Sequence, residues 1–500
     1  MSCFLQAPSL IPKLLKIPPL EALLLFTSSN LQGLQPTHLK IPIFCLKEVL
    51  EDGVTPGSDS LNNLLDWFVK FGLLHNARQL LDEMCGRIEF DAYTFGIMIR
   101  GYCAAGELDE AFDLLSELKE TKNGCRPNVV VYTTLIDGCC KNGDIESARR
   151  LFLEIEEMGL VANEFTYTVM INGYFKKGLK NDGFQLYEEM KMKGVPPNMY
   201  TYNAMISEYC RDGNLGKAFE IFNEMRKKGV ACTVVTYNTL LSGLCQQRKI
   251  AEAKKLIRRM KQRGLKSNSI TFNTLMDGFC KTGKLEEAVQ LLDRMKTGGH
   301  TPSLITYNSL IDGFARAARL AEAVNYFKEM LERGLSPNRV TYTILIGAFI
   351  KTQDLKRAFE VFSSMERTGL AADAHTYGVL INGLCMEGNM RDAMKLLGSM
   401  IEKGVVPSDV IYNTMICGYC RQGSSYRAFR LVKEMKEKGM VPNVASFSLT
   451  IGVLCKDSKL QEAEDLLDEM IKSLDGGINR TDAKTPAKNQ RQKNARHLRR

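Results

Sequence analysis

Apolar residues recur along the chain in two alternating helical patterns, and one segment shows both. After residue 269 the apolar side chains fall at i, i+3, i+4 and i+7, which places them on one helical face: Phe272, Leu275, Met276 and Phe279. A glycine interrupts this pattern, and a second apolar face follows: Leu285, Ala288, Leu292 and Met295. The segment is therefore predicted to form two amphipathic helices joined by a turn.

Polar residues mark the ends of the second predicted helix. Glu286 lies in its first turn and Lys296 in its last, so each charge complements the helix dipole. Gly299 follows the C-terminal end of this helix, where a residue in the left-handed conformation is expected, and Ser303 is suited to cap the next helix. One hairpin is thus expected to end where the next begins.

The hairpin repeats with a period of 35 residues. Glycine, methionine and aromatic residues each recur at this step, from Gly159 to Gly439, from Met190 to Met470 and from Tyr132 to Phe447. The units are expected to begin at Ser58, Ala92, Val129, Glu164, Met199, Val234, Ser269, Leu304, Arg339, Ala374, Asp409 and Val444. A hairpin this small cannot bury its own apolar face, so the pattern predicts an all-α solenoid in which stacked repeats share a core.

Eight of the 15 cysteines follow the same period: Cys103, Cys140, Cys210, Cys245, Cys280, Cys385, Cys420 and Cys455. One cysteine at the same helical place in each repeat indicates a small buried side chain. The single C-x-x-C pair, Cys417 and Cys420, lacks the second pair that a zinc site needs. No metal and no cofactor are therefore expected.

Charge and motifs limit the classes of function. The net charge is +9, but residues 478–500 hold eight basic residues against one acid, so the rest of the chain is nearly neutral. No apolar run approaches the ~18 residues of a membrane span. No phosphate-binding loop and no partnered nucleophile are present. The sequence therefore indicates a binding protein with no catalytic residues, no small-molecule substrate and no membrane partner.

The repeats differ from two related helical-hairpin families and resemble a third. Tetratricopeptide repeats carry a tryptophan signature in ~34 residues, whereas this chain has one tryptophan, Trp67. The first helices resemble the pentatricopeptide repeat (PPR), as in Val234-Val-Thr-Tyr-Asn-Thr-Leu-Leu-Ser-Gly-Leu-Cys245. Units of constant length resemble the pure-repeat subfamily of plant organellar RNA-binding proteins. The resemblance implies a right-handed superhelical solenoid of helix-turn-helix repeats.

The resemblance also implies a partner, single-stranded RNA, with one base bound per repeat. In the family the base is read by the fifth residue of the first helix and by the last residue of the repeat. The paired base-reading residues are Asn62 with Asp91, Thr133 with Asn163, Thr168 with Asn198, Asn203 with Thr233, Asn238 with Asn268, Asn273 with Ser303, Asn308 with Asn338, Thr343 with Asp373, and Asn413 with Asn443. Two repeats have glycine at the fifth place, Gly96 and Gly378, and are expected to lack a base preference.

Applied to these pairs, the family's code implies the target 5′-UNAAYYCYGNYN-3′. The residue at the second place of the first helix is expected to pack on the base: Val130, Phe165, Tyr200, Val235, Ile270, Ile305, Val340 and Val410. The last residues of the repeats also suit helix caps, and the two roles are compatible. A helical-repeat scaffold that binds a protein remains the alternative, although it does not predict short polar residues at the reading places.

The chain is expected to divide into four segments. Residues 1–22 are expected to be an organelle presequence, mitochondrial rather than chloroplast, because the first 20 residues include Lys13 and Lys16 and no acid. Residues 23–57 are expected to form a degenerate repeat or N-terminal cap, and residues 58–478 an array of about twelve repeats. Residues 479–500 are expected to be a disordered basic tail. The implied role is transcript stabilisation, processing, splicing or translation by occupying RNA, with processing or splicing factors as further candidate partners.

Overall fold

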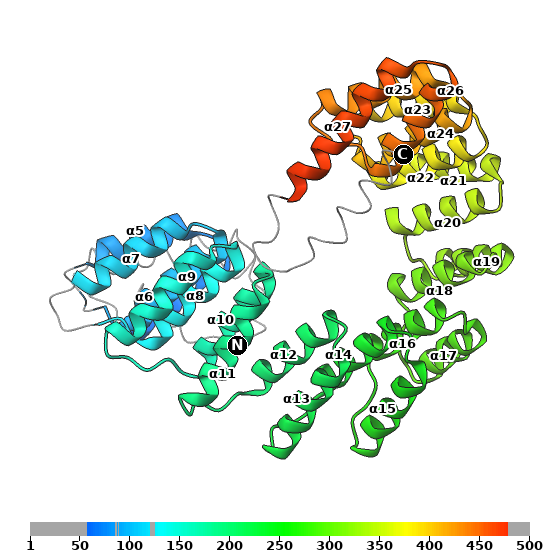
Figure 1. Cartoon of the computed structure of the whole chain (residues 1–500). Helices are drawn as coiled ribbons and strands as arrows, with labels where there is room; N and C mark the ends of the chain where they lie inside the picture. Colours follow the sequence, from blue (N-terminus) through cyan, green and yellow to red (C-terminus); the bar gives the residue numbers. More distant parts are fainter. Residues whose placement is uncertain (1–57, 86–87, 89, 121–125, 479–500) are drawn as a thin grey trace, which may run out of the picture. The chain divides into compact units, whose positions relative to one another are not determined.

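The computed structural model describes residues 58–478 except 86–87, 89 and 121–125. The predicted presequence, the N-terminal cap and the basic tail lie outside these residues. Twenty-four helices make up the described part, together with one isolated bridge between Cys85 and Ile88 (Figure 1). None of these helices is long and apolar enough to cross a membrane.

The helices alternate between the two members of each hairpin. The first helices are α4 (Ser58–Lys70), α6 (Ala92–Ala105), α8 (Val129–Asn142), α10 (Glu164–Lys177), α12 (Met199–Arg211), α14 (Val234–Gln246), α16 (Ser269–Lys281), α18 (Leu304–Arg316), α20 (Arg339–Lys351), α22 (Ala374–Met386), α24 (Asp409–Arg421) and α26 (Val444–Lys456). The second helices are α5 (Leu74–Met84), α7 (Leu108–Glu120), α9 (Ile145–Glu157), α11 (Lys180–Met192), α13 (Leu215–Lys227), α15 (Ile250–Gln262), α17 (Leu285–Thr297), α19 (Leu320–Glu332), α21 (Leu355–Arg367), α23 (Met390–Glu402), α25 (Ser425–Glu437) and α27 (Leu460–Ile478). Each residue predicted to begin a unit is the first residue of a first helix.

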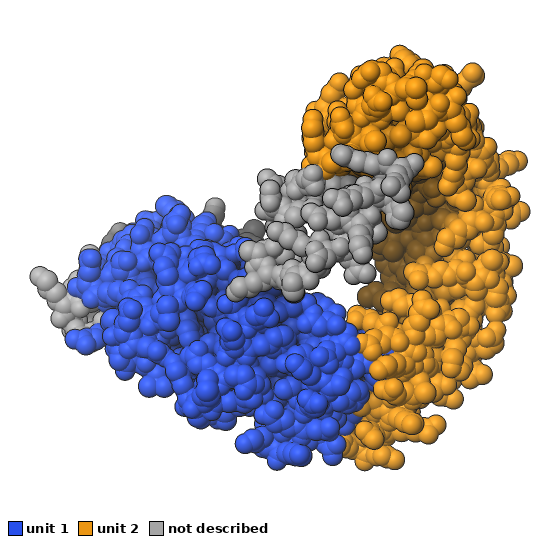
Figure 2. Space-filling view, viewed as in Figure 1, with its two compact units in different colours: residues 1–244 blue, residues 245–500 orange. Residues whose placement is uncertain are grey.

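The chain forms two compact units, residues 1–244 and 245–500, which are described separately (Figure 2). In the first unit α4, α6, α8, α10 and α12 each contact the next of these first helices. In the second unit the same holds for α16, α18, α20, α22, α24 and α26. The second helices pack against the first helix of their own hairpin and, as α9 and α17 do, against that of the following one. Within each unit the first helices therefore form a continuous layer.

The periodic apolar residues form the core, as predicted. All methionines of the series from Met190 to Met470 are buried, and so are the aromatic residues except the partly buried Phe272. The tyrosine hydroxyl donates to a glutamate of the second helix, as Tyr132 does to Glu154 and Tyr307 to Glu329, both at 2.9 Å. These tyrosines therefore join the two helices of their hairpins through packing and a hydrogen bond, whereas the buried hydroxyl of Tyr377 has no hydrogen-bond partner.

Close packing between repeats explains the glycine near the middle of most first helices. A Cβ placed on Gly278 would lie 2.5 Å from Sγ of Cys245, and one on Gly313 would lie 2.6 Å from Cβ of Cys280. The periodic cysteines are buried as predicted, with the exception of the exposed Cys455. Cys455 lies in α26, and no further first helix follows in the described residues to cover it. The glycine series from Gly159 to Gly439 has φ of 72–79°, which confirms the left-handed helix ends.

Candidate nucleic-acid interface

Most first helices expose one large apolar side chain at the second residue; α4, α22 and α26 have Asp59, His375 and Ala445 there. The eight residues predicted to pack on bases, Val130, Phe165, Tyr200, Val235, Ile270, Ile305, Val340 and Val410, are 54–65% exposed. Side chains of this kind normally belong in a core, and their regular exposure marks a surface that is not completed by the chain itself. Tyr93, at the second place of α6, is 64% exposed and belongs to the same series. It was absent from the sequence prediction although its register in the repeat identifies it.

The fifth residues lie deeper on the same helices. Asn62, Thr168, Asn238, Thr343 and Asn413 are buried. The other predicted readers at this place, Thr133, Asn203, Asn273 and Asn308, are partly buried. The second and fifth residues therefore form the rim and the floor of one surface in each repeat.

The last residues of the repeats cap the following first helices. Oδ1 of Asn163 accepts from the backbone N–H groups of Phe165 and Thr166 at 3.0 Å, and Asn128, Asn198 and Asp373 cap in the same way. Capping occupies Oδ1 and leaves the Nδ2 donor of an asparagine for another partner. The expectation that these residues can both cap a helix and contact a base is therefore stereochemically consistent.

Unpaired polar atoms concentrate at the predicted reading places. Seven buried side-chain polar atoms in the described residues lack a hydrogen-bond partner, and four of them belong to predicted base-reading residues: Asn62 Oδ1, Asn198 Nδ2, Asn203 Oδ1 and Thr233 Oγ1. Leaving such an atom unpaired costs roughly 1–3 kcal/mol, so buried polar groups normally have partners. These atoms lie where an external ligand would supply the missing hydrogen bonds.

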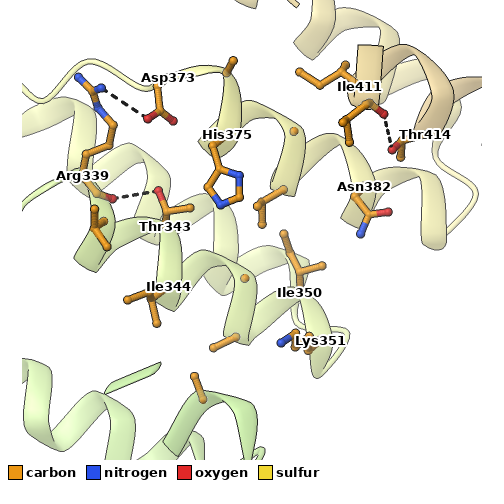
Figure 3. Close-up of a pocket in the computed structure, with 18 of the residues that line it drawn as sticks. Arg339, Thr343, Ile344, Ile350, Lys351, Asp373, His375, Asn382, Ile411 and Thr414 are labelled. Carbon is orange, nitrogen blue, oxygen red and sulfur yellow. Dashed lines mark hydrogen bonds and ion pairs between the residues drawn. The ribbon is translucent and has the colours of Figure 1, made fainter. Parts of the chain in front are cut away.

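A groove of about 990 Å³ in the second unit shows how the surface is built (Figure 3). Its lining comes from the same places of successive first helices, including Val340, His375 and Val410 at the second place and Thr343 and Gly378 at the fifth. Figure 3 shows the His375 ring standing beside Thr343. At Gly378 no reading side chain enters the groove, and a Cβ at this glycine would lie 3.3 Å from Cγ1 of Ile411.

Asp373, the predicted partner of Thr343, is held as a carboxylate beside this groove. Burial opposes its ionisation, but hydrogen bonds from the N–H and hydroxyl of Thr376, both at 2.9 Å, keep the pKa of Asp373 below its ordinary value. Arg339 lies 3.5 Å from the carboxylate and adds to this effect. Asp373 therefore presents only hydrogen-bond acceptors at neutral pH.

A series of cations follows the same helices and was not recognised from the sequence. The last turn of most first helices carries one exposed basic residue: Lys141, Lys176, Arg211, Lys281, Arg316, Lys351, Arg421 and Lys456. Arg316 and Lys351 line the groove directly. Total charge concealed this series, because acids balance it: Lys141, Lys281 and Arg316 each form an ion pair with an aspartate four residues earlier in the same helix. Its period of 35 residues is the signal that identifies it.

Nowhere in the described ranges do three His, Cys, Asp or Glu side chains gather closely enough to hold a metal ion. The fold and this surface define a helical-repeat protein in which most repeats present an apolar residue, a polar pair and a cation on the first helix.

Comparison with known proteins identifies the family. A model described as the PPR repeat family matches segments that together cover residues 56–386 and 407–456, and a PPR repeat model matches 375–405 and 445–473. The chain therefore belongs to the pentatricopeptide repeat family.

Similar proteins carry the same family name. A pentatricopeptide repeat-containing protein of Arabidopsis thaliana is 48% identical over 100 residues, which is 20% of this chain and 17% of the relative. A chloroplastic member from the same plant is 34% identical over 106 residues, or 21% of this chain and 14% of that protein. A mitochondrial member is 28% identical over 153 residues, or 28% of this chain and 19% of the relative. The chain thus spans less than a fifth of the length of these relatives.

A solved structure supports the fold. The crystal structure of the pentatricopeptide repeat protein PPR10 in complex with an 18-nt psaJ RNA element has a TM-score of 0.56 to this chain at 23% identity. The match covers 91% of this chain and 77% of that one. It supports the helical-repeat fold of the described residues.

Proposed function

We propose that this chain binds single-stranded RNA in a sequence-specific manner, with one base at each repeat. The observation that carries the proposal is the presence of buried, unpaired polar atoms at four predicted base-reading residues. A splayed-out base offers donors and acceptors on its Watson–Crick edge, and a short polar side chain at a fixed offset can pair with them. Extended RNA presents such an edge at regular intervals, and the repeats present their reading side chains at regular intervals.

The other two series of residues suit the remaining parts of a nucleotide. The exposed second-place side chains offer apolar surfaces to base faces, and stacking on Phe165 or Tyr200 would contribute ~1–3 kcal/mol for each base. The cations at the ends of the first helices would attract phosphates. Base face, base edge and phosphate therefore each have a matching side chain in most repeats.

The proposed target is 5′-UNAAYYCYGNYN-3′, with the RNA running 5′ to 3′ as the repeats run from N to C terminus. The bound RNA of PPR10 supports the class of ligand by relationship. The presence of chloroplastic and mitochondrial members among the relatives supports an organellar location, for which we propose the mitochondrion. The proposed action is occupancy of a transcript, with processing or splicing factors recruited to it, rather than catalysis.

Equilibrium binding to three labelled oligonucleotides tests the proposal. One is the RNA UGAAUCCCGAUU. In the second RNA the adenines at places three and four and the guanine at place nine are replaced. The third is a DNA duplex of the first sequence. Tight binding of the first alone is expected. Equal affinity for the two RNAs would remove the base assignments, and absence of binding to either RNA would favour the protein-binding scaffold.

A further inference from the structure

A buried threonine lies beneath each predicted reading residue, and it comes from the following repeat. The third residue of the first helix is threonine or serine in most repeats and is almost fully buried: Thr94, Thr166, Thr201, Thr236, Thr271, Thr306, Thr341, Thr376 and Ser446. In sequence this residue resembles a helix cap. In the structure five of these hydroxyls also lie within hydrogen-bond distance of the fifth residue of the preceding repeat: Thr166 with Thr133, Thr201 with Thr168, Thr306 with Asn273, Thr341 with Asn308 and Thr376 with Thr343. Oδ1 of Asn62 and of Asn203 has no hydrogen-bond partner, and Oδ1 of Asn413 accepts from the backbone N–H of Asn443.

Repeats eight and nine show the contact most clearly. The Thr341 hydroxyl donates to Oδ1 of Asn308 at 2.7 Å. Oγ1 of Thr341 also accepts from the N–H of Asn338 at 3.3 Å, and Oδ1 of Asn338 is satisfied by the N–H of Thr341 at 3.0 Å. The hydroxyl also lies 3.1 Å from Oδ1 of Asn338, but that oxygen already accepts from the N–H of Thr341 and the contact with Asn308 is shorter, so we assign the single hydroxyl proton of Thr341 to Asn308. Thr306 donates to Oδ1 of Asn273 at 2.8 Å in the same way.

This contact determines which end of the asparagine faces the groove. An asparagine side chain has one acceptor oxygen and one NH₂ donor. With Oδ1 held by the threonine beneath it, Asn308 presents its NH₂ outward. O2 is an acceptor that uracil and cytosine share, so a fixed donor agrees with the pyrimidine expected at this repeat and does not separate the two bases.

Threonine readers present the opposite polarity. The hydroxyl of Thr343 donates to the carbonyl of Arg339 at 2.9 Å, and its oxygen lies 2.9 Å from that of Thr376. Thr133 donates to the carbonyl of Val129 at 2.7 Å and contacts Thr166 at 2.7 Å. Because its proton is used within its own helix, each reader offers a lone pair outward. Purines carry amino donors, which agrees with the adenine and guanine expected at these repeats.

The two glycine repeats lack both parts of this arrangement, the polar reader and the hydroxyl of the following repeat. Gly96 faces Val131, and a Cβ at Gly96 would lie 4.0 Å from the valine Cγ2. Gly378 faces Ile411, with a corresponding distance of 3.3 Å to Cγ1. Every asparagine or threonine reader is followed by a threonine or serine at the third place of the next repeat, whereas both glycines are followed by an apolar residue. The reader and the residue beneath it therefore vary together within this one chain.

We propose that the third residue of a repeat is a positioning residue where it contacts an asparagine reader, as Thr306 contacts Asn273 and Thr341 contacts Asn308: it holds Oδ1 of the reader of the preceding repeat and so turns the amide NH₂ toward the base. The inference rests on the proposed RNA-binding function. The third residue has no exposed surface and does not touch RNA. It acts through the side chain above it.

Substitution of Thr341 in the full chain tests this role. Thr341→Val retains the shape but removes the hydroxyl, so Asn308 is free to turn. We expect the preference for pyrimidine over purine at base eight to fall about tenfold, the effect of losing one hydrogen bond of ~1.4 kcal/mol. Preference at base four, read by Thr168 and Asn198, should be unchanged, and Thr341→Ser should restore the preference at base eight. A purely structural role would lower the melting temperature and all affinities together and leave the base preference intact.

The reverse substitution provides an independent test at the glycine repeat. Gly378→Asn together with Ile411→Thr should create a preference for cytosine at base ten. The new asparagine would share its repeat with Ser408 as the last residue, and this pair of reading residues would match Asn273 with Ser303. Gly378→Asn alone should not, since its Cβ meets Ile411 and no hydroxyl orients its amide. If Thr341→Val keeps both the wild-type affinity and the wild-type selectivity at base eight, the positioning role is overturned and the proposed RNA-binding function is not. Failure of the wild-type chain to bind RNA would overturn the proposed function as well.

Discussion

The two faces of each first helix differ in how strictly their residues repeat. On the core face one residue type recurs in eight of the twelve units at each of three places: tyrosine at the fourth, glycine at the tenth and cysteine at the twelfth, as in Tyr237, Gly243 and Cys245. On the groove face the fifth place alternates among asparagine, threonine and glycine. Stacking identical hairpins demands the same contact each time, so the core face specifies the fold. Residues on the groove face need not make the same contact in every repeat, so they can differ from repeat to repeat and prefer different bases.

Cysteine reactivity should separate the two faces most strongly. Burial raises the pKa of Cys280 on the core face to about 12, so at pH 8 its reactive thiolate is roughly a thousandfold rarer than that of an ordinary cysteine. Cys417, at the ninth place of α24, is partly exposed, whereas Cys420 in the same helix is buried. A maleimide should therefore label Cys417 far faster than Cys420 or Cys280, as measured by mass spectrometry of peptides.

RNA provides the control for this comparison. Asp312, Gly347 and Asn382, at the same place as Cys417, line the groove. Bound target RNA should therefore slow labelling of Cys417 and leave the exposed Cys85 unaffected. Equal labelling of Cys417 and Cys420 in the folded chain would contradict the assignment of the two faces.

Adding a methyl group to the core face should lower stability. Gly278→Ala would place its Cβ 2.5 Å from Sγ of Cys245, and overpacking of this kind costs ~1–3 kcal/mol. The matched control is Gly398→Ala in α23, where no atom lies within 4 Å of the new Cβ. The control should stabilise the chain by roughly 0.5–1 kcal/mol, because alanine favours a helix interior. Urea unfolding followed by circular dichroism measures both, and a loss in Gly398→Ala equal to that in Gly278→Ala would contradict the packing argument.

A substitution on the groove face should change specificity rather than stability. Thr343→Asn keeps Asp373 as its partner and matches the pair of Asn62 with Asp91, so base nine should change from guanine to uracil. A direct base contact is worth ~1–3 kcal/mol, or about 5- to 150-fold in relative affinity. Competition binding with RNAs that differ only at base nine measures this change. Retention of guanine preference would show that the residue does not read the base.

The smallest expected effect is at the cations. Lys351→Gln should weaken binding severalfold for every RNA and lower the slope of log K against log salt by about 1, because a phosphate contact carries no base information. Titrations at several salt concentrations measure the slope. A change in base preference without a change in slope would assign Lys351 to base recognition.

The periodic pattern explains why so much of the fold was predictable. The start of each first helix, the left-handed glycines and the burial of the periodic cysteines all follow from local spacing and from a core repeated unit by unit. The contact between Thr341 and Asn308 joins residues 33 apart on different helices, and only the structure reveals it. Tyr93 and the cation series had a periodic signal that was overlooked. The close approach of Ile411 to Gly378 joins two different helices, and sequence alone does not show it.

Selection from a random RNA pool by the full chain tests the central claim most directly, because it scores every repeat at once. The account predicts a bound consensus with fixed bases at places one, three, four, seven and nine, pyrimidines at the places read by paired asparagines, and no preference at places two and ten, which face Gly96 and Gly378. A consensus with strong preference at those two glycine repeats, or no consensus at all, would contradict it.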